Sequence, residues 1–145
     1  VCKSNAKVTT IEKGKPNIPI ADNNPIGVND TIDFPDVGVA SSLEIAVSLD
    51  NSDIGSVVVE LFDPNNVKYV LYSKGSLGTK LDSVWPTASQ PVQGNLFAWV
   101  GKNPKGKWRL IVYDHKFKDN TTDGKIASWS VKTTSISNKM VCLKN

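Results

Sequence analysis

The stretch from Asp114 to Asp123 gathers oxygen-bearing side chains that could bind a metal ion. Asp114, Asp119 and Asp123 lie in it together with Asn120, and Asp53 is a candidate neighbour from an adjoining loop. Calcium prefers carboxylate and amide oxygens, although this spacing differs from that of an EF-hand loop. A calcium site is therefore one interpretation. The other is that these aspartates cap turns and face solvent.

The sequence lacks the residues that catalysis would require. His115 is the single histidine, and it lies between Asp114 and Lys116 at a predicted strand end. A Ser-His-Asp or Cys-His arrangement would have to use this exposed loop position. The GxSxG, HExxH and CxxC motifs and the phosphate-binding glycine loops are absent. We therefore predict no catalytic residues and a role that is not enzymatic.

The two cysteines, Cys2 and Cys142, lie near opposite ends of the chain. In a sandwich whose first and last strands are neighbours, a disulfide between them would contribute at most roughly 4 to 5 kcal/mol. Such a bond requires an oxidising compartment, which predicts a secreted or cell-surface protein. The alternative is two unrelated free thiols in a reducing compartment.

The net charge of +3 bears on the class of partner. It arises from sixteen lysines and one arginine, Arg109, which are scattered along the chain. Nucleic-acid sites usually cluster arginine, because its planar guanidinium pairs with phosphates and base edges. No apolar run approaches the roughly 20 residues of a membrane span, and the N-terminal residues do not resemble a signal peptide. We expect a soluble, processed or trimmed protein that does not bind nucleic acid.

Apolar and polar residues alternate along much of the chain, which is typical of β-strands. One face of such a strand holds four apolar residues: Leu43, Ile45, Val47 and Leu49. Residues 57–62 and 67–72 flank the sequence Asp63-Pro64-Asn65-Asn66, whose turn chemistry predicts a β-hairpin.

Further strands are expected at residues 96–99, 108–114 and 126–134, with a long irregular connection over 73–93. Together these make about eight antiparallel strands of the usual length, which predicts an all-β, jelly-roll-like β-sandwich of one domain. The predicted organisation is a peripheral N-terminal arm (1–19), the sandwich (20–135) and a C-terminal tail tied back by the disulfide (136–145).

Four residues mark the closing strands of this sandwich: Gly106, Trp108, Gly124 and Trp129. Gly106 permits a tight turn directly before Trp108, an inward aromatic that can fill the end of the core. Trp129 has the same position in the last strand, and Asp123-Gly124 supplies the turn chemistry before it. We predict that these residues are structural.

The runs GKNPKGKWRLIVYD and DGKIASWSV closely resemble the C-terminal half of the P-domain that follows the catalytic domain of proprotein convertases. Upstream, NNPIGVNDTI resembles the opening strand of the family, and SLEIAVSLDNSDIGSVVVELFDPNNVKYVLY resembles its central strand pair. The resemblance spans Ile20 to Thr134. It implies a module that follows a protease and supports its folding and its calcium and pH behaviour.

Two positions depart from the family pattern. Gly55-Ser56-Val57 lacks the acidic residue that commonly follows this glycine, and Asn66 stands where a glycine usually closes the turn. Asparagine tolerates the left-handed conformation, so the second change is compatible with the fold. The first change weakens the case that this chain shares a metal site of the family near residues 55–57.

We therefore predict a non-catalytic accessory module of a secreted protein, which stabilises or targets a linked subtilisin-like or other protease. The alternative is a stand-alone cell-surface module for adhesion or assembly that binds protein or carbohydrate. Trp85, Trp99 and Tyr113 could form a surface that stacks against sugar, although tryptophan in a small sandwich more often belongs to the core.

Overall fold

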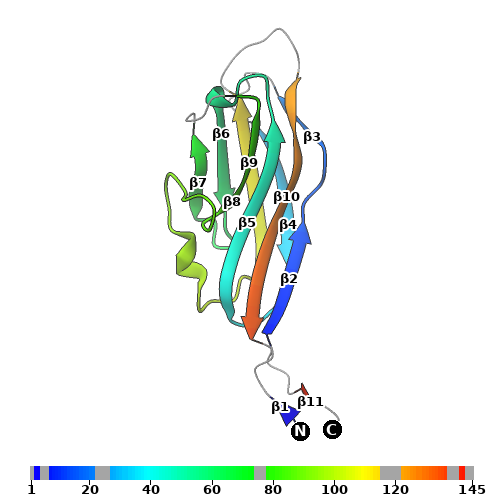
Figure 1. Ribbon diagram of the computed structural model, residues 1–145, viewed down its shortest axis with the longest axis vertical. Helices are drawn as coiled ribbons and strands as arrows, with labels where there is room; N and C mark the ends of the chain where they lie inside the picture. The colour runs from blue at the N-terminus through cyan, green and yellow to red at the C-terminus, as the bar shows by residue number, and fades with distance from the viewer. Residues whose placement is uncertain are drawn as a thin grey trace.

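The computed structural model describes residues 2–3, 7–21, 27–73, 78–114, 122–136 and 141–142. Two antiparallel sheets, of five and four strands, face each other across one apolar core (Figure 1). Each sheet has an inner face of apolar side chains, because successive residues of a strand point to opposite sides. The all-β sandwich predicted from the alternating pattern is confirmed.

The five-stranded sheet is built around β10 (Thr122–Ile136). One edge of β10 pairs with β5 (Ala40–Asp50), and its other edge pairs with β2 (Lys7–Lys13) and β3 (Ile18–Ala21). β8 (Lys80–Trp85) pairs with the far edge of β5. The strand order is therefore β2-β10-β5-β8, with β3 continuing the β2 edge.

The four-stranded sheet has the order β4-β9-β6-β7. Its strands are β4 (Val28–Phe34), β9 (Gly106–Asp114), β6 (Val57–Phe62) and β7 (Lys68–Ser73). Two short 3-10 helices lie in the connections: η1 (Ile54–Ser56) and η2 (Leu96–Trp99). Each sheet thus combines strands from distant parts of the sequence, so the fold depends on long-range pairing.

The two ends of the chain lie together. β1 (Cys2–Lys3) and β11 (Val141–Cys142) form a separate antiparallel ribbon. Within the larger sheet Lys7 is paired with Ile136, where the chain enters and leaves the sandwich. Both termini therefore leave the sandwich at the same end (Figure 1).

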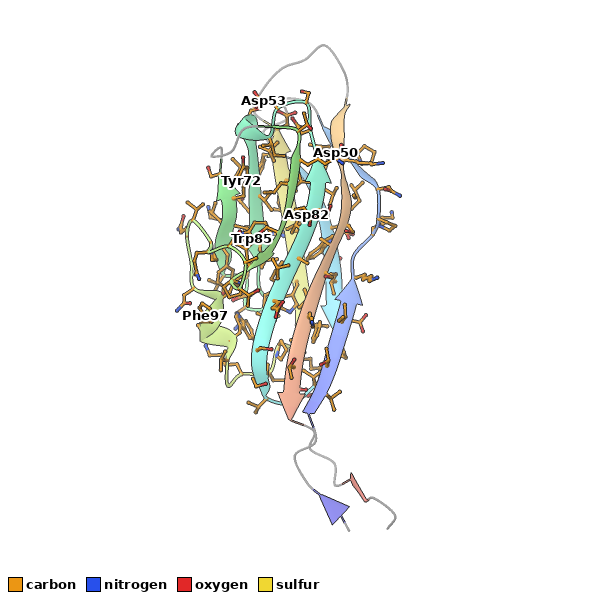
Figure 2. The ribbon with its side chains drawn as sticks, viewed as in Figure 1. Asp50, Asp53, Tyr72, Asp82, Trp85 and Phe97 are labelled. Carbon is orange, nitrogen blue, oxygen red and sulfur yellow. The ribbon has the colours of Figure 1, made fainter. Side chains whose placement is uncertain are left out.

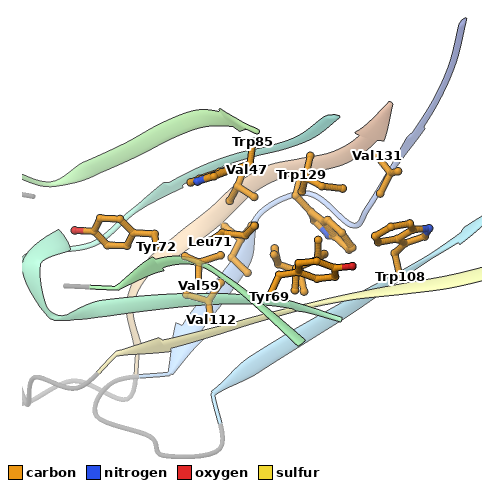
Figure 3. Packing of buried hydrophobic residues seen from close by; sticks show 14 of the residues in the cluster. Val47, Val59, Tyr69, Leu71, Tyr72, Trp85, Trp108, Val112, Trp129 and Val131 are labelled. Carbon is orange, nitrogen blue, oxygen red and sulfur yellow. The ribbon is translucent and has the colours of Figure 1, made fainter. Parts of the chain in front are cut away.

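The core follows the predicted alternation of β5. All four predicted inward residues are buried: Leu43, Ile45, Val47 and Leu49. They face residues of β6 and β9 in the other sheet, and Figure 3 shows Val47 and Trp129 above Val59 and Val112. Burial of these side chains is the main stabilising term, at roughly 1.5 to 3 kcal/mol for a fully buried large apolar side chain.

The turn between β6 and β7 has the chemistry that the sequence predicts. The Asp63 carboxylate accepts hydrogen bonds from the backbone N–H groups of Asn65, at 2.8 Å, and Val67, at 3.0 Å. Asn66 has φ of 64°, a left-handed conformation that asparagine tolerates. The predicted hairpin is confirmed.

Two local predictions are wrong. Residues 96–99 form η2 instead of a strand, because the apolar run is too short for its periodicity to distinguish the two. Asn95 caps this helix by accepting a hydrogen bond from the Phe97 N–H at 3.1 Å. The connection over residues 73–93 contains β8, whose short alternation is obscured by the glycines and prolines around it.

The predicted N-terminal arm over residues 1–19 includes β2 and the first part of β3. Both strands are hydrogen bonded to β10 and form the outer edge of the five-stranded sheet. Across the residues that the structure describes, no helix has the length and apolar character needed to cross a membrane.

Candidate functional site

Two of the aspartates predicted as calcium ligands, Asp53 and Asp114, lie at the end of the sandwich opposite the termini. Asn51 connects two of them: its Nδ2 donates to Asp114 Oδ2 at 3.0 Å, and its Oδ1 accepts from the Asp53 backbone N–H at 3.0 Å. Asn51 and Asp114 are both buried. The structure therefore brings Asp53 and Asp114 to the same end of the molecule, as the sequence predicts (Asp50 and Asp53 are labelled in Figure 2).

Asp53 has a clear local role. Its Oδ1 accepts a hydrogen bond from the Gly55 N–H at 3.0 Å, and its backbone carbonyl accepts one from Ser56 Oγ at 2.9 Å. The side chain is therefore the N-cap of η1 and satisfies a backbone donor that the short helix leaves free. This is the capping role that the sequence offered as the alternative to metal binding.

The described residues do not by themselves assemble a metal site. Among them, no three His, Cys, Asp or Glu side chains lie close enough together to hold an ion. His115, Asp119 and Asn120, and the side chain of Asp123, lie outside the described residues. Calcium at this end would require ligands from those positions in addition to Asp114, so it stays a prediction.

Gly124 closes this end by allowing β10 to approach the end of β5. It has φ of 79°, and a Cβ atom added to it would lie 2.0 Å from the Asp50 carbonyl oxygen. The next residue, Lys125, donates its N–H to Asp50 Oδ1 at 3.1 Å. Glycine is therefore required here by both conformation and space.

Gly106 has the corresponding position at the other end of the sandwich. Its φ is 132°, and an added Cβ would lie 2.6 Å from the Pro64 Cβ atom. The start of β9 therefore packs directly against the turn between β6 and β7. The sequence identified both glycines, but not the segments that they approach.

Trp108 and Trp129 are fully buried, as predicted, and each indole N–H has a hydrogen-bond partner. Trp108 Nε1 donates to the Pro104 carbonyl at 2.9 Å. Trp129 Nε1 donates to Asp30 Oδ2 at 2.8 Å, and the same oxygen accepts from the Lys15 N–H at 2.7 Å. Asp30 thus ties β4 of one sheet to β10 and to the segment between β2 and β3.

A buried polar network joins the β6–β7 turn to η2. Trp99 Nε1 donates to the Tyr69 hydroxyl at 3.0 Å, and that hydroxyl donates to Asp63 Oδ2 at 2.9 Å. The Trp99 ring also packs against Trp108 with 5.0 Å between ring centroids. Burial raises the pKa of Tyr69 to about 12. Sequence reasoning missed this network, because its members come from three separate segments.

The aromatic residues proposed as a sugar-stacking surface are not arranged as one. Trp85 and Trp99 belong to the core, at 2% and 5% exposure. Tyr113 is half-buried, and its pKa is raised by burial and by its hydrogen bond to Glu60. An exposed aromatic platform formed by these three residues is therefore excluded.

The register of β1 and β11 places Cys2 opposite Cys142. Directly opposite residues of an antiparallel pair have Cα atoms about 4.5 to 5.5 Å apart, which is within the range that disulfides span. This arrangement supports the predicted bond, which stays a prediction because the side chains of both cysteines lie outside the description.

The outer face of the five-stranded sheet has a cavity of about 140 Å³. Small residues of β5 and β10 lie between Lys13 on one side and Asp82 on the other: Ala46, Ser48, Ser128 and Ser130. These groups can hydrogen bond to a polar molecule. Three serines and no histidine or cysteine line the cavity.

Comparison with known families identifies the class of protein that this fold represents. The family model of the proprotein convertase P-domain matches residues 40–133. The match begins at the first residue of β5 and ends within β10, so it includes most strands of both sheets. This chain belongs to the proprotein convertase P-domain family, as its sequence predicts. No curated protein sequence matches it.

Solved structures share the fold. The serine protease of Aeromonas sobria in complex with its chaperone has 17% identity and a TM-score of 0.62, with 91% of this chain and 27% of that chain covered. The same protease alone has 18% identity and a TM-score of 0.59, with 90% of this chain and 27% of that chain covered. The VP2 subviral particle of infectious bursal disease virus has 12% identity and a TM-score of 0.52, with 92% of this chain and 33% of that chain covered. This chain therefore spans about a quarter to a third of these proteins.

Proposed function

We propose that this chain is a non-catalytic accessory module of a secreted protein, and that it stabilises or targets a linked protease domain. The observation that carries the proposal is the P-domain match over residues 40–133. The serine protease of Aeromonas sobria supports it, because the shared fold makes up 27% of a longer protease chain.

The polar groups of the described core also support a structural role. Asp30, Asp63 and Asn51 each hydrogen bond to backbone or side-chain donors that hold strands and turns together. Catalytic groups, in contrast, usually line a cleft, where a neighbouring acid or base is positioned to act on a bound substrate. An extracellular location follows from the proposal, since P-domains accompany secreted proteases.

The experiment is removal of the module from the complete natural polypeptide. We expect the truncated protein to be secreted at a lower yield and to melt at a lower temperature, because a folded neighbour that contacts only the native protease raises its stability. A Trp108→Ala variant, which should destabilise the module in place by about 3 to 5 kcal/mol, should reproduce the loss. The measurements are secreted yield, proteolytic activity and calorimetric melting temperature.

Two results would contradict the proposal. One is a protease whose yield, activity and melting temperature do not change when the module is removed. The other is a complete polypeptide that contains no protease domain, which would favour a stand-alone adhesion or assembly module. Burial of Trp85 and Trp99 already removes the aromatic surface on which a sugar-binding version of that alternative depended.

A further inference from the structure

The cavity on the outer face of the five-stranded sheet follows from the register of the two central strands. Ser128 is paired with Ser48, and Ser130 with Ala46, so these four residues occupy neighbouring positions of β10 and β5. Their side chains share the outer face, because directly opposite residues of antiparallel strands point to the same side. All four are small and form the floor of the cavity, which measures about 140 Å³. We call this cavity the serine hollow.

Charged residues of opposite sign stand on the two sides of the serine hollow. Lys13 ends β2 and is paired with Ser130, whereas Asp82 belongs to β8 and is paired with Ser48. Both residues line the cavity, and both are exposed. Because the strand order is β2-β10-β5-β8, an ammonium group and a carboxylate face each other across the floor (Figure 1; Asp82 is labelled in Figure 2).

The edge of the sheet is interrupted beside Ser128. β2 is paired with β10 from Ser130 onward and β3 is paired with it up to Ile126, so neither strand has a residue opposite Ser128. Gly14 follows Lys13 at this point, and its N–H donates to the Trp129 carbonyl at 2.9 Å. Glycine has no side chain, so this edge leaves space that a larger residue would fill.

The polar groups of the serine hollow are available to a ligand. Among the described residues, the hydroxyls of Ser48, Ser128 and Ser130 have no hydrogen-bond partner. Within the same part of the chain, Lys13 and Asp82 have no ion-pair partner. A hydroxyl can both donate and accept a hydrogen bond, so the floor can pair with the N–H and C=O of a peptide group.

The dimensions of the serine hollow limit the size of its ligand. Three inter-strand spacings separate β2 from β8, so the backbones that carry Lys13 and Asp82 are about 14 Å apart. The two side chains shorten this gap, but a ligand that reaches both must carry its charges several ångströms apart. An extended dipeptide separates its ammonium and carboxylate by roughly 7 Å. The volume of the hollow is close to that of an engineered cavity of about 150 Å³ that holds benzene, so the ligand is small.

We infer that the serine hollow binds a small zwitterion of dipeptide length, with its carboxylate toward Lys13 and its ammonium toward Asp82. Charge-assisted hydrogen bonds at both ends favour a zwitterion over a neutral sugar. A sugar site would also use an exposed aromatic ring, whereas the one aromatic residue that lines the hollow, Trp129, is buried. The inference does not depend on the proposed function.

The test is a titration of the 145-residue chain with glycylglycine, followed by the NMR shifts of its amide groups. We expect shifts at Ser48, Asp82 and residues 128–130 that saturate with a dissociation constant of about 1 to 10 mM, because the ligand is small and both charges are exposed. Acetyl-glycylglycine lacks the ammonium and glycylglycinamide lacks the carboxylate, so each should bind about two- to fivefold more weakly.

Variants assign the two ends of the ligand. Asp82→Asn should weaken glycylglycine binding by about two- to fivefold and remove the difference between glycylglycine and its acetylated form. Lys13→Met should remove the difference between glycylglycine and glycylglycinamide. Ser130→Leu fills the floor and should prevent binding while the chain stays folded, since this side chain lies on the outer face.

Asp33→Asn and Lys107→Met are the matched controls, because they make the same charge changes at exposed positions of the other sheet. Neither should change the binding of glycylglycine. Glucose that shifts the same amide signals at the same concentration would assign the serine hollow to a neutral polyol and overturn the inference. Spectra that do not change at about 100 mM glycylglycine, or equal losses in the control variants, would also overturn it.

Discussion

Asp63 illustrates how one buried carboxylate organises a turn. One of its oxygens accepts two backbone N–H groups within the turn, and the other accepts the Tyr69 hydroxyl, which is itself bonded to Trp99. Hydrogen bonds to a charged group are worth more than neutral ones, at about 1.5 to 3 kcal/mol each. The β6–β7 turn and η2 are therefore positioned relative to each other by polar contacts as well as by packing.

The first prediction concerns the Tyr69 hydroxyl at high pH. Its pKa is raised to about 12, mainly by burial and further by the nearby Asp63 carboxylate. Because this is above the unfolded value near 10, the folded state holds the proton more tightly, and this stabilisation is complete below pH 10 and lost as the pH rises to 12. We expect this group to lower the free energy of unfolding by about 1 kcal/mol between pH 8 and pH 11.

Urea unfolding of the wild type and of Tyr69→Phe at both pH values measures this effect. The variant lacks the ionisable group, so its stability should fall less between the two pH values. Equal losses in the two proteins would contradict the prediction.

A second prediction concerns the two glycines Gly124 and Gly101, which both have positive φ. A Cβ at Gly124 would meet the backbone of Asp50, whereas a Cβ at Gly101 would have nothing within 4 Å. Gly101→Ala should therefore cost only the conformational term of about 1 to 2 kcal/mol. Gly124→Ala should cost about 2 kcal/mol more, because β10 must move away from β5. Chemical denaturation measures both, and equal costs would show that the space at Gly124 is unimportant.

At the scale of elements, β10 is the strand on which the five-stranded sheet depends. It pairs with β5 along one edge and with β2 and β3 along the other. Its Trp129 also reaches Asp30 of β4, so β10 connects the two sheets through a hydrogen bond in addition to apolar contact. Among the described strands, β2 and β3 are therefore attached to this sheet through their hydrogen bonds to β10.

The third prediction tests this connection. Asp30→Ala removes the acceptor of both the Trp129 indole N–H and the Lys15 backbone N–H. Leaving the buried indole donor unpaired should cost about 1 to 3 kcal/mol. Asp33→Ala, at an exposed position of the same strand, is the control and should change stability by less than about 0.5 kcal/mol. Similar losses in the two variants would contradict the role of Asp30.

A fourth prediction concerns calcium at the end that contains Asp53 and Asp114. If Asp119 and Asp123 complete a site with Asp114, calcium binds the folded state alone and must raise the melting temperature. We expect the thermal transition in millimolar calcium to lie above that in a chelator, and Asp114→Asn to reduce the difference. Coincident transitions would contradict the site and assign the aspartates to capping alone.

For the whole molecule, the terminal ribbon makes a fifth prediction. Because Cys2 is opposite Cys142, a disulfide there would close nearly the entire chain into one loop. Replacing both cysteines by serine should then lower the free energy of unfolding by at most roughly 4 to 5 kcal/mol. Mass spectrometry under non-reducing conditions checks the bond directly, and two free thiols would contradict it.

The sequence predicted those parts of the fold that depend on local pattern. The alternation of Leu43 to Leu49 was sufficient for β5, and the turn residues from Asp63 to Asn66 were sufficient for the β6–β7 hairpin. The apolar run at Leu96 was misread, because a strand and a 3-10 helix look alike over four residues. The Asn95 cap was the local signal that could have corrected it.

The candidate site was less predictable, for a physical reason. The contacts that define it join residues distant in the sequence, such as Asn51 with Asp114 and Asp30 with Trp129, separated by 63 and 99 positions. No periodic pattern encodes such pairs, since they arise only when the sheets are stacked.

The position of β10 near the end of the chain has a consequence for how the protein is made. Its neighbours β2 and β3 come first in the sequence and, among the described strands, pair in this sheet with β10 alone. A polypeptide that leaves the ribosome or a translocation channel N-terminus first must therefore keep these two strands unpaired until β10 has emerged. Folding of the sandwich is completed only after its whole length has been released, and its first strands need protection from wrong partners until that moment.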